Sequence, residues 1–337
     1  MRAFVFEDRF SRDALTLVER PQPKPGPGQA LVRVRANSLN YRDLVVAGGG
    51  YGRQVKLPLI PLSDGAGEVV DVGAGVTRVG PGARVAGIFM QSWLAGGLTE
   101  DKGKSALGGA MDGMLAEYVA LDAEGLVAIP EHLSYAEAAT LPCAAVTAWN
   151  ALVEEGGIRA GDSVLVLGTG GVSIFALQFA RLHGARVIAT SSSDEKLARA
   201  TALGASDGIN YRQTPEWGKR VLELTGGAGV DHIVEVGGAG TLPQSFRAVR
   251  YGGRISLIGV LAEPGAAVDP RPLLMKGARL QGIYVGSREM FVGMNRAIAL
   301  NGLRPVIDRV FPFAEAPEAY RYMKAAGHFG KIVVSGE

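Results

Sequence analysis

The stretch Ser-Val-Leu-Val-Leu-Gly-Thr-Gly-Gly-Val-Ser at residues 163–173 decides the fold of this chain. Residues 163–167 form a short apolar run typical of a buried strand, and Gly168 permits a tight turn after it. The apolar residues from Val172 onward predict a helix. The uncharged run Ser163–Ala180 approaches the length of a membrane span, but the glycines interrupt it. We therefore expect strand, turn and helix in succession.

A strand, glycine turn and helix in this order is typical of a site for a dinucleotide. Gly170 would let the backbone approach a pyrophosphate, and the first turn of the helix would offer free N–H groups to it. Glycine turns also serve close packing alone, and Ser173 replaces the usual third Gly or Ala of the motif. A second strand starting at Ala185 favours the dinucleotide. The expected contacts are Gly168, Thr169, Gly170, Gly171 and Val172.

The end of the second strand indicates which cofactor is bound. An NAD site usually has Asp or Glu there, whereas this strand runs into Ser191 and Ser192. Hydroxyl groups can donate to a 2′-phosphate that a carboxylate would repel. Lys196 follows one helical turn later, and Tyr211 closes the third strand. A serine cap on the helix at 194–203 is the alternative for Ser193 alone. These residues favour NADPH.

The wider pattern predicts an α/β protein of two domains, a β-rich one and a doubly wound one, in the 337 residues. The chain is β-rich over 1–125, with strands at 1–6, 30–36 and 65–71 and a long loop at 87–113. A helix is expected at 135–152. Six apolar runs then alternate with helical segments, as in a doubly wound six-stranded Rossmann sheet. The tail 288–337 has no place in that sheet, so we expect 1–125 and 288–337 to form one domain and 126–287 the other. The expected strands of the second domain are 163–167, 185–190, 208–211, 232–236, 254–259 and 279–285.

Composition excludes several classes of protein. The formal charge of +2 argues against a nucleic-acid protein held by a basic face. The N-terminus carries charges throughout and lacks a signal peptide's apolar core, so we expect a cytoplasmic protein without membrane segments. Glycine is frequent, at 48 residues, and Cys143 is the single cysteine. One cysteine forms no intrachain disulfide and no four-thiolate metal lobe.

Several motifs together resemble the medium-chain dehydrogenase/reductase superfamily. They are D-G-A-G-E-V at 64–69, V-G-P-G-A-R-V at 79–85, L-P-C-A-A-V-T-A-W at 141–149, the glycine turn, and G-K-I-V-V at 330–334. The resemblance covers essentially the whole chain. It implies a GroES-like catalytic domain, interrupted in sequence by a Rossmann cofactor domain, with the active site in the cleft.

Metal-ligand positions divide this superfamily into zinc and zinc-free enzymes. The zinc enzymes take a Cys from a C-x-x-D segment, a His from G-H-E and a second Cys from the later helix. The matching residues here are Asn40, Ser63 and Cys143. One ligand of three does not hold a catalytic zinc. The resemblance therefore points to the zinc-free branch similar to quinone oxidoreductase, and no metal is expected.

Without a metal, hydrogen-bond donors or protons from bulk solvent must stabilise the charge that develops on the acceptor. The resemblance points to Asn40, Tyr41, Asp43 and Tyr51, with Asn40 or Tyr41 as the donor and Asp43 orienting its neighbours. Asn and Asp also stabilise turns locally, and tyrosines often lie at a domain edge. The resemblance adds cofactor contacts at strand ends and on the later helix. These are Thr147, Gly237, Gly259, Val260, Leu261, Ile283, Val285 and Lys331.

These expectations lead to a functional hypothesis, an NADPH-dependent reductase of a quinone or an α,β-unsaturated carbonyl compound. The alternatives are a zinc-free alcohol or aldehyde dehydrogenase and a crystallin-like NADPH-binding protein with little turnover. The apolar sixth strand is a sheet edge, which favours a homodimer.

Overall fold

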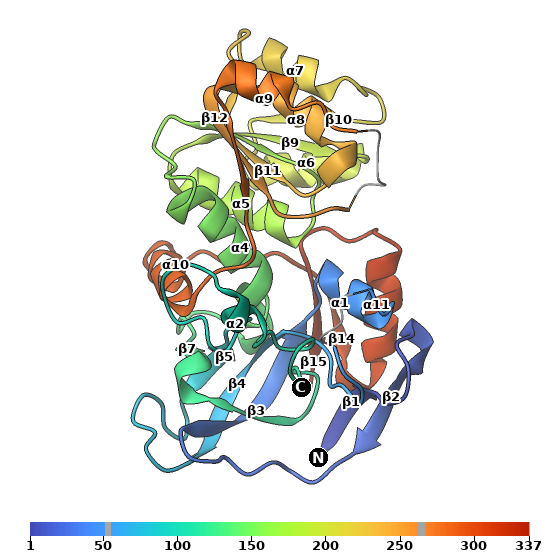
Figure 1. Cartoon of the computed structure of the whole chain (residues 1–337), viewed down its shortest axis with the longest axis vertical. Helices are drawn as coiled ribbons and strands as arrows, with labels where there is room; N and C mark the ends of the chain where they lie inside the picture. Colours follow the sequence, from blue (N-terminus) through green and yellow to red (C-terminus); the bar gives the residue numbers. More distant parts are fainter. Residues whose placement is uncertain (51–54, 262–266, 337) are drawn as a thin grey trace. The chain divides into compact units, whose positions relative to one another are not determined.

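The chain forms two compact units in the computed structural model, which describes residues 1–50, 55–261 and 267–336 (Figure 1). The first unit contains Met1–Val146 and Gly286–Glu337, and the second contains Thr147–Val285. The first boundary falls after Val146 rather than at 125/126. The reason is that strand β7 (Leu126–Ala128) pairs with β5 (Arg84–Gly87) in the sheet of the first unit.

The second unit is built on a six-stranded sheet with the order β10-β9-β8-β11-β12-β13. All five pairings in it are parallel, so the expectation of a doubly wound Rossmann sheet is confirmed. The strand bounds are Ser163–Val166 (β8), Arg186–Ser191 (β9), Asp207–Asn210 (β10), Val230–Glu235 (β11), Val249–Leu257 (β12) and Arg279–Gly282 (β13).

Helices cover this sheet. The helix predicted from Val172 is α5 (Gly171–Leu182), which packs on β8 and β9. Three further helices, α7 (Trp217–Leu224), α8 (Leu242–Ala248) and α9 (Arg271–Lys276), share one apolar core with the strands. That core includes Trp217, Phe246 and Ile255. Helix α6 (Asp194–Ala202) follows β9, and η5 is Gly238–Gly240.

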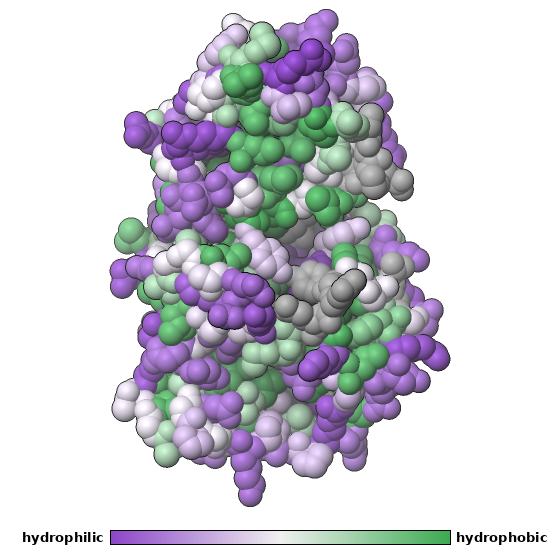
Figure 2. Space-filling view, viewed as in Figure 1, coloured by the Kyte–Doolittle hydropathy of each residue, from purple (hydrophilic) through white to green (hydrophobic). Residues whose placement is uncertain are grey.

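The edge strand β13 is shorter than expected and is exposed along its whole length. It ends at Gly282, and Val285 has a φ of 57°. A β-branched residue in the left-handed region does not continue a strand. Figure 2 shows hydrophobic residues gathering on one face of this unit. Large apolar side chains exposed near the edge are Tyr251, Val260, Leu261, Leu274, Met275, Leu280 and Tyr284.

The first unit contains a seven-stranded sheet of order β14-β15-β3-β4-β5-β7, with β6 (Tyr118–Asp122) also paired to β3. Strand β15 (Lys331–Ser335) pairs with β3 (Gln29–Ser38), so the tail does return to the first unit. Strand β4 (Asp64–Val72) pairs with β3 along its length. The remaining strands are β14 (Ile307–Pro312) and a two-stranded pair, β1 (Arg2–Phe6) and β2 (Leu15–Glu19).

The helix expected over 135–152 is divided into short segments. Pro142 has no N–H, and the N–H of Cys143 donates to the Asp64 carboxylate at 3.3 Å. The segments are α3 (Tyr135–Ala138), a π-helical turn η3 (Leu141–Ala145), α4 (Val146–Trp149) and a second π-helical turn η4 (Asn150–Glu154).

The other helices of the first unit are short or surround its sheet. The expected loop at 87–113 contains α2 (Glu100–Gly103). No helix in the described part of the chain is both long and apolar enough to cross a membrane. The bounds are Tyr41–Ala47 (α1), Arg288–Asn301 (α10), Ala316–Lys324 (α11), Arg12–Ala14 (η1), Ala123–Gly125 (η2) and Phe313–Glu315 (η6).

Candidate functional site

A cluster of buried polar side chains lies where three strands of the first unit meet. Its members are Asn40, Asp43, Asp64 and Lys331, each at most 8% exposed. Asn40 follows β3 and precedes α1, Asp64 opens β4, and Lys331 opens β15. The register places Ser38 opposite Asp64, and Leu39 N–H bonds the Ile332 carbonyl. Sheet pairing thus assembles residues that lie far apart in sequence.

Lys331 contacts both Asn40 and Asp64 and so connects the members of this cluster. Its Nζ donates to the Leu39 carbonyl at 2.7 Å and to Asn40 Oδ1 at 2.6 Å. It also lies 3.9 Å from Asp64 Oδ2. The bond to Oδ1 fixes the carboxamide of Asn40, whose Nδ2 is buried and makes no hydrogen bond of good geometry with a described residue. Nδ2 lies near Asp64 and favours its ionised form. The cluster therefore holds the Asn40 carboxamide in one orientation, with Oδ1 at Lys331 and Nδ2 near Asp64.

Asp64 is completely buried between donors. Ser63 Oγ donates to Oδ1 at 2.7 Å, and the backbone N–H of Cys143 donates to Oδ2 at 3.3 Å. Burial raises the pKa of this carboxyl group, and the Lys331 ammonium opposes that rise. The adjacent Leu62 has a φ of 68°, the conformation that the glycine of a G-H-E segment would favour.

Asp43 lies within α1 on the same buried side. Its Oδ2 accepts a hydrogen bond from the Asn40 backbone N–H at 2.7 Å, and Arg42 approaches Oδ1 at 3.4 Å. Burial raises the pKa of Asp43 to about 6, against the lowering effect of Arg42. Arg42 in turn donates to the Leu107 carbonyl. Asp43 therefore anchors the turn that carries Asn40.

The donor atoms of this cluster do not fit a catalytic zinc. Asn40, Ser63 and Cys143 match the ligand positions, but zinc prefers thiolate, imidazole and carboxylate. Burial and the nearby Asp64 raise the pKa of Cys143, which keeps its thiol protonated. The Lys331 ammonium already bonds Asn40. Among residues that the structure describes, no group of three His, Cys, Asp or Glu side chains is placed to hold a metal.

The two expected tyrosines are not part of the described cluster. Tyr41 opens α1 with half of its side chain exposed, and it makes no side-chain hydrogen bond to another described residue. Tyr51 lies outside the described residues. Of the four residues expected to be catalytic, the structure brings Asn40 and Asp43 together with Lys331, a residue expected near the cofactor.

The glycine turn of the second unit has the features of an anion cradle. Gly168 has a φ of 73°, and its N–H bonds Thr190 Oγ1 at 3.2 Å. A Cβ at Gly168 or Gly170 would meet no atom within 4 Å, so open space lies over the turn. Gly171 and Val172 open α5, whose N-cap is Gly170. The departure at Ser173 is accommodated because its Oγ donates to the Leu167 carbonyl at 2.6 Å.

The ends of β9 and β10 lie together beside this turn. Tyr211 N–H bonds the Ser191 carbonyl at 3.0 Å, and Ser191 Oγ accepts from the Ser193 N–H at 3.2 Å. Ser193 Oγ accepts a hydrogen bond from the Lys196 N–H and so caps α6. This is the alternative role that the sequence indicated for Ser193. The first carboxylate after β9 is Asp194, which already accepts from Asn210 and Gln213 side chains. Ser192, which lies between Ser191 and Ser193 in the sequence, is half-buried.

Sequence reasoning missed Glu235, which holds the loop after β11. This fully buried carboxylate accepts from the N–H groups of Gly237 and Gly238 at 2.8 and 3.1 Å. It also accepts from Thr241 Oγ1 at 2.6 Å and from Ser245 Oγ. An acid at the end of an apolar strand, followed by glycines, was the available signal.

The remaining expected contacts lie at strand ends or on the helix. The Gly259 N–H donates to the Glu235 carbonyl, and the Leu261 N–H donates to the Val236 carbonyl. Val260 is exposed, whereas Ile283 and Thr147 are buried. Asn150, also missed, donates from Nδ2 to the carbonyl of the left-handed Val285 at 2.8 Å.

Comparison with known proteins shows which family the chain belongs to. The chain matches the alcohol dehydrogenase GroES-like domain over residues 26–131 and the zinc-binding dehydrogenase domain over residues 171–299. It is 47% identical to a zinc-type alcohol dehydrogenase-like protein of Schizosaccharomyces pombe, covering 94% of this chain and 93% of the relative. It is 29% identical to a quinone oxidoreductase of Rattus norvegicus, with 93% and 90% covered.

Solved structures of similar proteins support the same family. A putative alcohol dehydrogenase from Sinorhizobium meliloti superimposes with a TM-score of 0.93 at 47% identity, covering 99% and 98% of the two chains. An NAD-dependent alcohol dehydrogenase gives 0.91 at 35% identity, with full coverage of both (100% and 100%). The 2-octenoyl-CoA carboxylase reductase CinF, in complex with NADP and 2-octenoyl-CoA, gives 0.87 at 28% identity, with 99% and 87% covered. The chain belongs to the medium-chain dehydrogenase/reductase superfamily of oxidoreductases, which bind a nicotinamide cofactor.

Proposed function

We propose that this protein is a zinc-independent, NADPH-dependent reductase of a quinone or an α,β-unsaturated carbonyl compound. The observation that carries the proposal is the bond from Lys331 Nζ to Asn40 Oδ1, at a position where zinc enzymes have a metal ligand. An ammonium group there supplies positive charge without a metal. The similarity to a quinone oxidoreductase and to a reductase complexed with NADP and an enoyl-CoA supports the same class of substrate.

The cluster has the properties needed to stabilise a developing oxyanion. Lys331 holds Oδ1 of Asn40, so Nδ2 is the end of the carboxamide that remains to donate to the acceptor oxygen. A preorganised donor in a water-excluded site is effective because it needs no reorganisation as charge develops. Asp43 fixes the Asn40 backbone, and the bound cofactor supplies the hydride.

The preference for NADPH rests on the end of β9. Ser191 and Ser192 stand where an NAD site carries an acid, and Asp194 is engaged by Asn210 and Gln213. Tyr211 is joined to Ser191 through the backbone, and Lys196 lies on the first turn of α6. These groups would hold the 2′-phosphate. The glycine turn would hold the pyrophosphate, with Gly168, Thr169 and Gly170 at the anion.

A zinc-free alcohol or aldehyde dehydrogenase is the second candidate. The relatives at 47% identity are a zinc-type alcohol dehydrogenase-like protein and a putative alcohol dehydrogenase, and these names favour an alcohol or aldehyde as the substrate. The two candidates share the cofactor, the fold and the metal-free cluster. They differ in the acceptor that is reduced, so an acceptor panel separates them.

The test is NADPH oxidation with a panel of quinones, enones and aldehydes. Quinones or enones should give the highest kcat/KM, and Asn40→Ala should lower kcat by about a hundredfold through loss of one oxyanion donor. The control is Asn301→Ala, because Asn301 Nδ2 only bonds the Ala297 carbonyl within α10. Exclusive turnover of aldehydes would favour the second candidate. NADPH binding without oxidation by any acceptor would favour a binding protein.

A further inference from the structure

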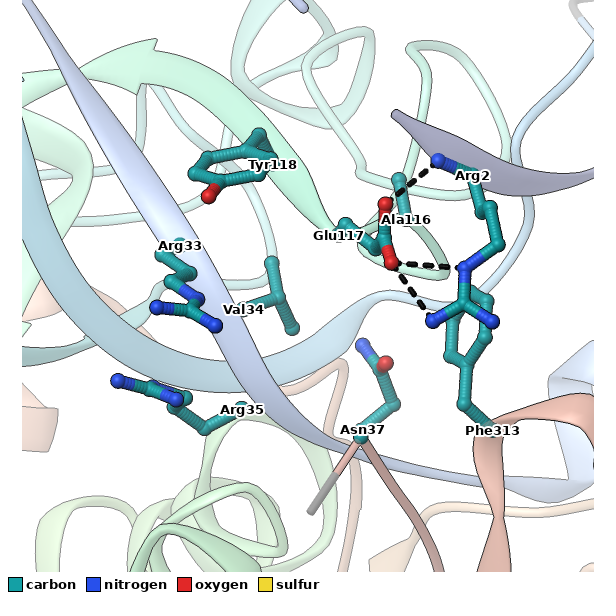
Figure 3. Close-up of a pocket in the computed structure, with 10 residues that line it drawn as sticks. Arg2, Arg33, Val34, Arg35, Asn37, Ala116, Glu117, Tyr118 and Phe313 are labelled. Atoms are coloured by element: carbon teal, nitrogen blue, oxygen red, sulfur yellow. Dashed lines mark hydrogen bonds and ion pairs between the residues drawn. The ribbon is translucent and has the colours of Figure 1, made fainter. Parts of the chain in front are cut away.

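A cavity of about 140 Å³ opens on the first unit, and it contains none of the buried cluster residues described above (Figure 3). Three arginines line it, namely Arg2, Arg33 and Arg35, together with Glu117, Tyr118 and Phe313. Arg2 lies on β1, and Arg33 and Arg35 lie on β3. Glu117 directly precedes β6, Tyr118 opens β6, and Phe313 opens η6. Every lining residue belongs to one unit.

A bulge in β3 explains why so many arginines converge here. The register of β3 against β4 shifts between Val34 and Ala36, which leaves Arg35 as the extra residue. In a regular strand, neighbouring side chains point to opposite faces. Here Arg33, Val34 and Arg35 all line the same cavity. Bulges re-aim side chains in this way and are frequent beside functional sites. The Arg35 carbonyl is held by the Gly336 N–H at 3.0 Å.

The positive charges of the cavity are only partly neutralised. Arg2 is fully engaged with Glu117, since its Nη2 and Nε lie 2.7 and 2.8 Å from Oε1. Arg35 reaches Glu68 only at 3.5 Å, and its Nε is buried without a hydrogen-bond partner among the described residues. Arg33 has no ion pair or side-chain hydrogen bond within the described part of the chain. Figure 3 shows Arg33 and Arg35 on the opposite side of the cavity from the Arg2–Glu117 pair.

We propose that this cavity binds a compact oxyanion with at least two negative charges, a phosphate monoester or a polycarboxylate, through Arg33 and Arg35. Planar guanidinium groups match phosphate and carboxylate oxygens with paired N–H donors. The cavity of about 140 Å³ equals roughly five liquid-water volumes of about 30 Å³ each, so it holds one anionic group such as a phosphate, and the rest of a larger ligand would extend through its opening. This site is independent of the proposed cofactor site in the second unit.

The test is calorimetric titration of the whole protein with inorganic phosphate at constant ionic strength. Saturable binding is expected, weakened about tenfold or more in Arg33→Gln because a charge-assisted contact is lost. The Arg33 side chain is exposed and makes no ion pair or hydrogen bond with another described residue, so this variant should fold normally. The matched control is Arg296→Gln on α10, also an exposed arginine, which should bind phosphate like the wild type.

Two further arms identify the ligand and its location. Glycerol phosphate and citrate distinguish a phosphate ester from a polycarboxylate, and acetate should bind far more weakly than either. Lys196→Gln removes a cation beside the proposed 2′-phosphate site. Phosphate binding lost in Lys196→Gln but kept in Arg33→Gln would overturn the proposal, as would equal binding by Arg33→Gln and the wild type. NADPH affinity is expected to be unchanged in Arg33→Gln, so failure here leaves the proposed function standing.

Discussion

The ammonium of Lys331 lies 2.6 Å from Asn40 Oδ1 and 3.9 Å from the Asp64 carboxylate, with only 2% of the lysine exposed. A single buried cation thus fixes a carboxamide and balances a carboxylate. The two acids of the cluster, Asp43 and Asp64, both have a raised pKa, which makes the charge of Lys331 central to the stability of the site.

Replacing Lys331 by Met should destabilise the fold by about 3 kcal/mol at pH 7, because it leaves Asp64 buried without a counter-charge. In Lys331→Met/Asp64→Asn the loss should be smaller than the sum of the single losses, by about 1 kcal/mol or more. Urea unfolding of the four proteins gives this coupling. Lys324→Met, on the exposed end of α11, is the control. Strict additivity would show that the two groups do not interact.

Asp43→Asn should change how stability depends on pH. With a folded pKa of about 6 against an ordinary 3.8, folded Asp43 keeps a proton that the unfolded chain has released. Stability from this group is therefore lost as pH rises from about 4 to 6, by on the order of 3 kcal/mol in full.

The carboxamide introduced by Asp43→Asn does not titrate. The free energy of unfolding of the variant, measured relative to that of the wild type, should therefore increase between pH 4 and 7. Urea unfolding at four pH values measures the difference. Asp101→Asn, whose side chain is 92% exposed, should show no such trend. A difference between Asp43→Asn and wild type that stays constant with pH would contradict the raised pKa.

Metal removal should leave the protein unaffected. We expect purified protein to contain no stoichiometric zinc, and chelator treatment to change neither activity nor melting temperature. The raised pKa of Cys143 predicts slow alkylation by iodoacetamide at pH 8 in the folded protein and rapid alkylation after unfolding. Stoichiometric zinc by elemental analysis would overturn the metal-free account.

The exposed edge strand β13 predicts a homodimer. Leu274 and Met275 are 81% and 75% exposed beside a strand whose outer edge is unpaired within the described residues. Light scattering should give about twice the chain mass of 35.2 kDa. Leu274→Asp should shift the mass toward the monomer. Leu300→Asp is the matched control, since Leu300 is 86% exposed on α10 of the other unit. A wild-type monomer would refute the dimer.

Local patterns made the second unit predictable. The apolar runs and glycines between 163 and 285 correspond to six parallel strands, of which β8, β9 and β11 are largely buried. The early end of β13 was not predictable, because nothing in the residue type reveals the left-handed backbone of Val285. Likewise, the breaks in the helix over 135–152 depend on the bond from Cys143 to Asp64.

The buried cluster was only partly predictable. The family resemblance predicted Asn40 and Asp43 as catalytic residues and Lys331 as a cofactor contact. It did not reveal the bond between Lys331 and Asn40, which lie 291 residues apart and meet only through sheet pairing. The arginine cavity was missed because a bulge at Arg35 has no clear sequence signature. The hydrophobic periodicity of a sequence does not reveal contacts that depend on pairing between distant strands or on an irregular backbone.

The most direct test of the central claim is the ratio of kcat/KM for NADPH to that for NADH, measured on chelator-treated protein with the best acceptor of the panel. A metal-free site with Ser191 and Ser192 at the end of β9 predicts undiminished activity and a ratio well above one, and Ser191→Asp should lower that ratio. Loss of activity on chelation, or a ratio below one, would contradict the account.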